Sequence, residues 1–316
     1  MKILLLYLQF LICFSTLLDQ IRIEVVDKAL LELPKRESID ILKMALEMSN
    51  AQNENSMTDA ESAYFAYKWI GQNIEYDCLS NKFGNSSTLP ATTYKNGKGG
   101  EVGISALFNM ICGFLNIESN TIFGIKKTIT RNFTNLIQYN EYAWNYISID
   151  NKYYLLDITS GAGYCIGDRF YRSQKDDYFA IDPELSIRYR FPNDKTWQLL
   201  SKPITEAKFK SQAILYDGFF KYFKTITPDV QTIKNQDKIK IKLTVKDPKI
   251  KKLYFTESYE IENEMPIFGF EEEVTIVNGT CEYILYPFGT GYADVDISED
   301  KKKYYGLVRY EVYNEE

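Results

Sequence analysis

This 316-residue chain contains five cysteines, whose side chains could act as nucleophiles or metal ligands, but it contains no histidine. The cysteines are Cys13, Cys78, Cys112, Cys165 and Cys281. Histidine is the usual general base at neutral pH, because its ordinary pKa is about 6.5. A chain without it cannot form a Ser-His or Cys-His pair. No Cys-x-x-Cys spacing occurs either, so we expect neither a metal site nor a cofactor.

Composition limits the classes of partner and the number of domains. The formal net charge is −6, which does not favour nucleic acid or an anionic membrane surface as a partner. We therefore expect a protein partner. Apolar residues make up 45% of the chain, enough to bury a sizeable core, and the length is comfortable for two domains.

The amino terminus has the pattern of a secretory signal peptide. Lys2 is followed by an apolar run from Ile3 to Leu18, and Asp19 ends it. We expect residues 1–18 to direct the chain out of the cell or to its surface, with no membrane insertion after cleavage. The cleavage position stays open, near Ser15 or slightly beyond. The alternative is an uncleaved signal anchor that holds the protein in a membrane.

Removal of this segment would leave four cysteines in an oxidising compartment, where zero, one or two disulfides are possible. These four are Cys78, Cys112, Cys165 and Cys281, and their pairing is open. A bond between Cys78, after a predicted helix end, and Cys165, after a glycine-rich loop, is conceivable. Three Asn-x-Ser/Thr sequons, at Asn85, Asn132 and Asn278, give secretion weak support.

Helical spacing dominates the first part of the chain. We predict a helical lead-in over 19–60, a helix from a cap near Asp59, and a loop over 79–100. A second helix is predicted to begin around Gly103, so that Glu101 precedes it. Its apolar residues recur at helical spacing, and they are Ile104, Leu107, Phe108, Ile111, Cys112 and Leu115.

The apolar period changes to two after Asn116, which predicts strands. The expected strands cover residues 121–125, 142–149 and 153–158, and the last two fold back through Asp150-Asn151. From about residue 226 the alternation continues without any helical pattern. The sequence therefore predicts an α+β domain over 61–225, with a C-terminal extension, followed by an all-β immunoglobulin-like sandwich over 226–316.

Four segments, taken in order, resemble the transglutaminase-like family, and most of all its kyphoscoliosis peptidase branch. They are AYKWI with NIEYD at 66–70 and 73–77, GKGGEVGISALF at 97–108, YAWN at 142–145 and YYLLDIT at 153–159. The resemblance implies a papain/transglutaminase-like core, in which a helix bundle packs on an antiparallel sheet. It also implies positions for the family's Cys-His-Asp triad.

Two of these three positions depart from the family pattern. Aligned on Gly103, the nucleophile's position holds Glu101, and the base's position before Ala-Trp-Asn holds Tyr142, whereas Asp157 is retained. A carboxylate cannot accept an acyl group as a thiolate does, and a tyrosine with a pKa near ~10 is a poor base. We therefore predict a pseudoenzyme with no catalytic residues, used as a binding or scaffolding module.

Two enzymatic alternatives stay open at this point. One is a hydrolase with altered chemistry, in which Glu101 and Asp157 act as a carboxylate pair. The other is residual transglutaminase- or peptidase-type activity from the thiol of Cys78 or Cys165, which would need a base other than histidine. For the pseudoenzyme we expect Glu101, Tyr142 and Asp157 to form a hydrogen-bonded cluster, with the Tyr142 hydroxyl separating the two carboxylates.

Overall fold

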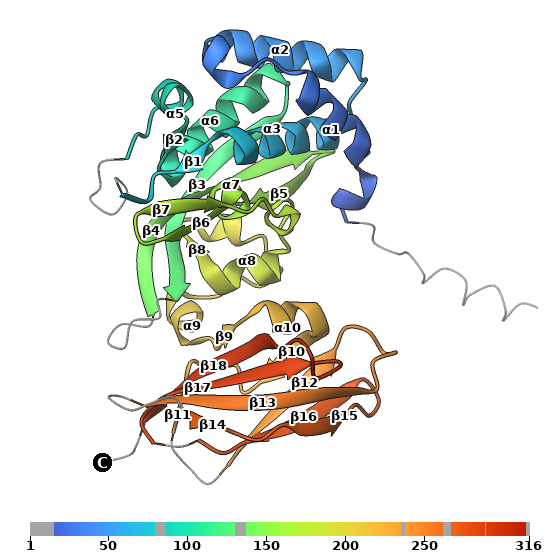
Figure 1. The fold of residues 1–316 in the computed structure, drawn as a ribbon, viewed down its shortest axis with the longest axis vertical. Coiled ribbons are helices and arrows are strands. Elements are labelled where there is room, and N and C mark those ends of the chain that lie inside the picture. Colours follow the sequence, from blue (N-terminus) through green and yellow to red (C-terminus); the bar gives the residue numbers. More distant parts are fainter. Residues whose placement is uncertain are drawn as a thin grey trace, which may run out of the picture. The chain divides into compact units, whose positions relative to one another are not determined.

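A computed structural model describes residues 16–79, 86–129, 137–234, 238–261, 267–287 and 289–313. Nearly all of the predicted signal peptide lies outside these ranges, and so do the sequons at Asn85 and Asn132. The chain divides into two compact units (Figure 1), which are described separately below. In the described residues, the first unit comprises 16–126, 139–186 and 192–200, and the second comprises all the others.

Helices supply much of the first unit. They are α1 (Ile23–Glu32), α2 (Ile41–Glu54), α3 (Asp59–Asn73), α5 (Pro90–Asn96), α6 (Glu101–Phe114) and α7 (Ile158–Ala162), with α8 (Pro183–Tyr189) after them. Helix α3 begins with a capping box, in which the Thr58 hydroxyl accepts from the Glu61 amide and the Glu61 carboxylate accepts from the Thr58 amide. The cap is thus Thr58, and Asp59 is the first helical residue.

Helix α6 buries the apolar stripe that the sequence predicts. Its spacing of three and four residues places the six predicted apolar side chains in the core, where each is at most 1% exposed. The helix begins at Glu101, with Gly100 as its cap, two residues before the expected start. Glu101 therefore lies in the first turn instead of preceding the helix.

Helix α5 corrects the prediction of a loop over 79–100. Pro90 occupies the first turn, where its missing N–H costs nothing, and Gly97 ends the helix at a left-handed φ of 67°. After α5, strand β2 (Lys98–Gly99) pairs in parallel with β1 (Glu75–Tyr76), which follows α3. The short pairing brings the end of α3 beside the start of α6.

The sheet of the first unit places β5 (Lys152–Leu156), β4 (Ile137–Ile149) and β3 (Glu118–Ile129) side by side in that order. Asp150 and Asn151 join β4 to β5 with φ angles of 52° and 60°, as in a type I′ hairpin turn, so the predicted turn is confirmed. The strand expected over 153–158 ends at Leu156, because Asp157 caps the short helix α7.

Side chains of β4 alternate between two hydrophobic clusters, as a pleated strand requires. Ile147 and Ile149 pack in the cluster that contains the buried residues of α3 and α6. Tyr142, Trp144 and Tyr146 pack in a separate cluster. This alternation determines which side chains of β4 can approach the start of α6.

The remaining elements of the first unit are short. Strands β6 (Gly163–Ile166) and β7 (Arg169–Arg172) form an antiparallel hairpin, and 3₁₀ turns occur at Leu18–Gln20, Arg36–Ser38, Asp176–Tyr178 and Lys195–Gln198. Strand β8 (Arg190–Pro192) follows α8.

The second unit begins with short elements and continues as β-strands. The early elements are α9 (Glu206–Ser211), β9 (Ile214–Leu215) and α10 (Asp217–Tyr222). The strands are β10 (Phe223–Thr227), β11 (Thr232–Lys234), β12 (Ile239–Val245), β13 (Lys252–Ile261), β14 (Ile267–Phe268), β15 (Glu272–Thr275), β16 (Thr280–Leu285), β17 (Gly291–Ser298) and β18 (Tyr305–Tyr313). All described helices precede residue 223, so the predicted all-β region is confirmed.

Two sheets share the core of the second unit. One has the order β10-β12-β16, and the other follows β11-β18-β17-β13, with β14 and β15 both pairing with β13. Strand β12 alternates buried and more exposed residues, as the Ile239-to-Val245 pattern predicts. The described residues therefore form an α+β part followed by an all-β region.

Candidate functional site

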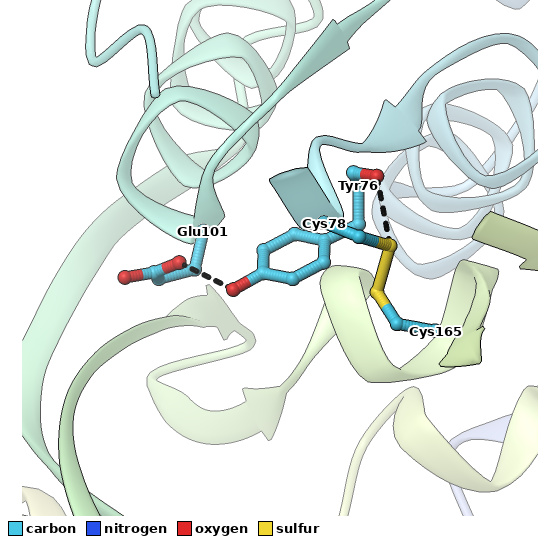
Figure 2. Close-up of a disulfide and its surroundings, with 4 residues drawn as sticks. All are labelled: Tyr76, Cys78, Glu101 and Cys165. Carbon is cyan, nitrogen blue, oxygen red and sulfur yellow. Dashed lines mark hydrogen bonds between the residues drawn. A yellow bond between two sulfur atoms is a disulfide. The ribbon is translucent and has the colours of Figure 1, made fainter. Parts of the chain in front are cut away.

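The first part of the candidate site, called here the α6 start, is formed by Glu101 and Tyr76. The Glu101 side chain is partly buried in the first turn of α6, where a carboxylate interacts favourably with the helix dipole. The Tyr76 hydroxyl, carried by β1, donates to Glu101 Oε2 over 3.1 Å (Figure 2). This hydrogen bond holds one carboxylate oxygen of Glu101 against the β1 strand.

Tyr76 lies in the electric field of three carboxylates, those of Glu101, Asp157 and Asp77. Burial of its ring raises the pKa of Tyr76 well above the ordinary value, and the charge and hydrogen bond of Glu101 raise it further. The Asp157 carboxylate acts on the pKa of Tyr76 in the same direction. Tyr76 therefore remains a neutral hydrogen-bond donor throughout the physiological pH range, and it cannot serve as a base there.

The second part of the site, called here the Asp157 cluster, consists of Asp157, Tyr142, Ser160 and Lys126. Asp157 is fully buried, with 0% exposure, and caps α7. Its Oδ1 accepts from the Ser160 amide over 2.9 Å and from the Tyr142 hydroxyl over 3.0 Å. Its Oδ2 accepts from the Ser160 hydroxyl over 2.6 Å. The carboxylate thus has hydrogen-bond donors on both oxygens, as a buried charge requires.

Lys126 supplies positive charge to the cluster from β3. Its Nζ lies 3.9 Å from Asp157 Oδ2, donates to the Ser160 hydroxyl over 2.7 Å, and stands 4.1 Å from the Tyr142 ring centroid. A cation at this distance compensates the negative charge of the buried carboxylate and also interacts favourably with the face of the Tyr142 ring. A lysine ammonium and a tyrosine hydroxyl are therefore both neighbours of the Asp157 carboxylate.

The structure brings together only part of the expected Glu101–Tyr142–Asp157 cluster. Tyr142 donates to Asp157, but the hydroxyl that donates to Glu101 belongs to Tyr76, so Tyr142 does not bridge the two carboxylates. The reason lies in β4, where Tyr142 packs with Trp144 in a cluster separate from the one that contains the buried face of α6.

Sequence reasoning missed three residues of the site, namely Tyr76, Ser160 and Lys126. Tyr76 lies in the NIEYD segment, which contributes to the family resemblance but has no site residue assigned to it by that resemblance. Ser160 follows Asp157 by three residues, a spacing typical of a helix cap and a signal that could have been used. Lys126 carries no local signal, because its partners are more than 15 residues away in the sequence.

Asn145, the last residue of the YAWN segment, connects the sheet to α6. Its side-chain amide donates to the Ser105 carbonyl over 3.2 Å and to Asn109 Oδ1 over 2.9 Å. Since Asn145 is fully buried, these bonds satisfy donors that would otherwise be costly. They fix the position of α6 relative to β4, and therefore of the two parts of the site.

A disulfide joins Cys78 to Cys165, with their Cα atoms 6.1 Å apart (Figure 2). The pairing that the sequence left open is thus settled for these two. Cys112 and Cys281 are buried and unpaired, and burial raises the pKa of these thiols to about 12 and about 11. Neither thiol would ionise appreciably at neutral pH.

A polar cavity of about 540 Å³ lies near the end of β1 and the beginning of β2. Its lining residues are Asp77, Ser86, Ser87, Thr88, Leu89, Thr92, Asn96 and Lys98. Glu101 and Asp157 do not line it. The Ser87 carbonyl packs against Gly103, where an added Cβ would come within 2.2 Å of that oxygen. Gly103 therefore allows the 86–89 segment to cover the first turn of α6.

Two kinds of feature are absent from the described ranges. No group of three or more Cys, Asp or Glu side chains there is arranged to hold a metal ion. Among the helices of the same ranges, none is long and apolar enough to cross a membrane.

Comparison with known proteins assigns part of the first unit to a family. Residues 47–158 match the family model of the transglutaminase-like superfamily. These residues belong to the transglutaminase-like superfamily. The chain is similar to human kyphoscoliosis peptidase, with 25% identity over 204 residues that cover 60% of this chain and 30% of that protein. The transglutaminase-like domain thus contains Glu101, Tyr142 and Asp157, the three positions singled out in the sequence.

Two invertebrate proteins also match. Lim and transglutaminase domain protein ltd-1 of Caenorhabditis elegans is 23% identical over 186 residues, which cover 54% of this chain and 25% of that protein. Hillarin of Drosophila melanogaster is 20% identical over 224 residues, which cover 66% of this chain and 27% of that protein. The matched part thus spans less than a third of each relative's own length.

Proposed function

We propose that this chain is a non-catalytic transglutaminase-like protein, which is secreted or held at the cell surface and used to bind or scaffold another protein. Glu101 carries this proposal. It occupies the first turn of α6, where the sequence resemblance places the family's nucleophilic cysteine. No histidine is present in the chain to act as the base. Glu101 cannot replace a thiolate as an acyl acceptor, since an acylated carboxylate would be an anhydride.

The proposed compartment rests on the amino-terminal sequence and on the disulfide. A bond between Cys78 and Cys165 is typical of chains that fold outside the reducing cytosol. Leu17 is only 5% exposed and packs in the core of the first unit. We therefore place signal cleavage before Leu17, close to Ser15, so that the mature chain keeps this contact.

Burial disfavours the alternative of a hydrolase with a Glu101/Asp157 pair. A carboxylate pair of this kind must reach both the substrate and a water molecule. Asp157 is fully buried and accepts hydrogen bonds on both of its oxygens. Thiol chemistry at Cys78 or Cys165 would require reduction of their disulfide first.

The experiment is a comparison of the wild-type chain with the double variant Glu101→Cys/Tyr142→His, which rebuilds the family's side chains. We expect the wild type to show no peptidase or transamidase turnover on peptide and amine probes. We expect the thiol introduced by Glu101→Cys in the double variant to have a pKa below the ordinary ~8.5, because a helix start and an imidazole both favour the thiolate.

The single variant Glu101→Cys is the matched control, because it keeps the helix start but lacks the imidazole. Wild-type turnover that iodoacetamide abolishes would refute the non-catalytic proposal. A thiol pKa in the double variant equal to that in the single variant would show that positions 101 and 142 do not form a common site.

A further inference from the structure

The sequon at Asn278 lies in an exposed, tight turn of the second unit. Asn278 and Gly279 have φ angles of 50° and 76°, and Val277 and Thr280 exchange two backbone hydrogen bonds of 2.8 and 3.0 Å. These features define a two-residue hairpin turn of type I′. The Asn278 side chain is exposed, and a Cβ added at Gly279 would have no atom within 4 Å. A bulky group on Asn278 would therefore meet open space.

The turn alone explains Asn278 and Gly279, because Asn-Gly is a preferred pair at left-handed positions. It does not by itself require Thr280, the residue that completes the sequon. The Thr280 hydroxyl does donate to the Val277 carbonyl over 3.1 Å, a bond that serine could also form. A local structural role therefore exists for threonine, so the sequon alone does not show that Asn278 is modified.

One such observation is the position of the turn between two sheet edges. Strand β15 pairs with β13 at one end of its sheet, and β16 pairs with β12 at one end of the other. Residues 276–279 join these two strands. In the described residues, β16 lies last in the order β10-β12-β16. Edge strands expose unpaired backbone groups that can pair with another chain, and proteins commonly cover or charge them.

Apolar exposure near the turn makes such cover useful. Val277, which precedes Asn278, is 60% exposed, and Phe268 and Phe270, which lie beyond the opposite end of β15, are 79% and 94% exposed. A hydrated oligosaccharide attached at the turn would extend over solvent next to these edges.

A second observation comes from the other unit. The Cys78–Cys165 disulfide is expected in a chain that folds in an oxidising compartment. In eukaryotic cells, oligosaccharides are transferred to Asn-x-Ser/Thr triplets in the same compartment. The exposed sequon and the disulfide are independent features, and both fit the same route of synthesis.

We infer that Asn278 carries an N-linked oligosaccharide that covers the edges formed by β15 and β16. The inference rests on the proposed secretion of the chain. The donor would be an oligosaccharide linked to a lipid pyrophosphate. The side-chain amide nitrogen of Asn278 forms the new bond to the anomeric carbon and loses one proton, and the lipid pyrophosphate leaves with the electrons of the broken bond.

The experiment uses the full chain, with its own amino-terminal segment, produced in insect cells. Protein from the medium is deglycosylated with a peptide N-glycosidase in ¹⁸O water, and the peptide that contains Asn278 is analysed by mass spectrometry. We expect conversion of Asn278 to ¹⁸O-labelled aspartate only in the enzyme-treated sample, because the Asn278-Gly279 pair can also deamidate spontaneously in ¹⁸O water without a glycan. Peptide mapping is needed because Asn85 and Asn132 lie in sequons as well.

Three variants serve as controls. Asn278→Gly keeps a residue suited to the left-handed turn and removes the acceptor, and Thr280→Ala removes the sequon without changing Asn278. Both variants should lose the label at position 278. If no other sequon is occupied, both variants should carry no glycan at all. Thr280→Ser keeps both the sequon and a hydroxyl at this position, so it should retain the modification.

The outcomes separate this inference from the proposed function. Secreted, disulfide-bonded protein with unmodified Asn278 would overturn the glycan alone. Protein that stays in the cytosol with free Cys78 and Cys165 and unmodified Asn278 would overturn both the secretion proposal and the glycan.

Discussion

The α6 start and the Asp157 cluster lie in the same transglutaminase-like domain, but they hold their carboxylates differently. Glu101 is partly exposed and accepts one hydrogen bond, from Tyr76. Asp157 is fully buried, accepts from Tyr142 and Ser160, and lies near a lysine ammonium. The first carboxylate has water as an alternative partner, whereas the second depends on the protein alone.

This difference suggests that substitutions at the two positions differ in their cost in stability. At a helix start, a carboxylate is favoured by the helix dipole and can be introduced at little cost in stability. A buried aspartate depends on its neighbours, because an uncompensated buried charge is costly. Lys126 and Tyr142 together provide the charge and the donor that such an aspartate needs.

The largest effect is expected for Asp157→Ala. This change leaves the buried Tyr142 hydroxyl and the Lys126 ammonium without this acceptor and removes the cap of α7. We expect the free energy of unfolding to fall by about 3 kcal/mol, as for other broken buried charge networks. Urea denaturation followed by tryptophan fluorescence would measure it.

A double-mutant cycle with Lys126→Met tests whether the charge pair causes this loss. If Lys126 compensates Asp157, the two changes together should cost less than the sum of their separate costs. Strictly additive losses would contradict the compensation by Lys126 and would leave the cap of α7 and the hydrogen bond from Tyr142 as the roles of Asp157.

A smaller effect is expected for Tyr142→Phe, which removes one donor to Asp157 but keeps the packed ring. We expect a loss of about 2 kcal/mol in the free energy of unfolding, because a buried acceptor loses a partner. Tyr153→Phe on the neighbouring strand β5 is the matched control, since the Tyr153 side chain is 48% exposed. Equal effects of the two substitutions would mean that the Tyr142 hydroxyl contributes nothing specific.

The smallest effect is expected for Glu101→Gln. Glutamine keeps an oxygen that can accept from Tyr76, and only the interaction between charge and helix dipole is lost. The free energy of unfolding should fall by less than about 1 kcal/mol. Thermal unfolding of the variant beside the wild type would measure this change. A loss as large as that of Asp157→Ala would invalidate the contrast between the two parts of the site.

Local patterns predicted several elements well. The apolar spacing of Ile104, Leu107 and Phe108 identified a buried helix face, because a helix repeats every 3.6 residues whatever it packs against. The Asp150-Asn151 pair identified the β4–β5 turn, since both residues tolerate left-handed backbone angles. The alternation from Ile239 to Val245 likewise identified a strand with one buried face.

Contacts between distant segments could not be predicted in this way. The hydroxyl that reaches Glu101 was assigned to Tyr142, but the pleat of β4 places Tyr142 with Trp144 and leaves this role to Tyr76. Lys126 lies in the Asp157 cluster because β3 pairs with β4. This pairing joins distant segments, so no local sequence pattern predicts it. The start of α6 was also placed two residues late, because Gly100 caps the helix through its backbone alone.

The disulfide has a consequence for the chain before it folds. Cys78 and Cys165 are 87 residues apart, and the loop that they close contains Glu101, Tyr142 and Asp157. In a chain-entropy treatment, closing a loop of this length removes unfolded conformations worth about 4 to 5 kcal/mol. The bond therefore confines all three positions to one ring of polypeptide even when their hydrogen bonds are broken. Refolding of the oxidised chain searches a much smaller set of conformations for the arrangement that joins Tyr142 to Asp157.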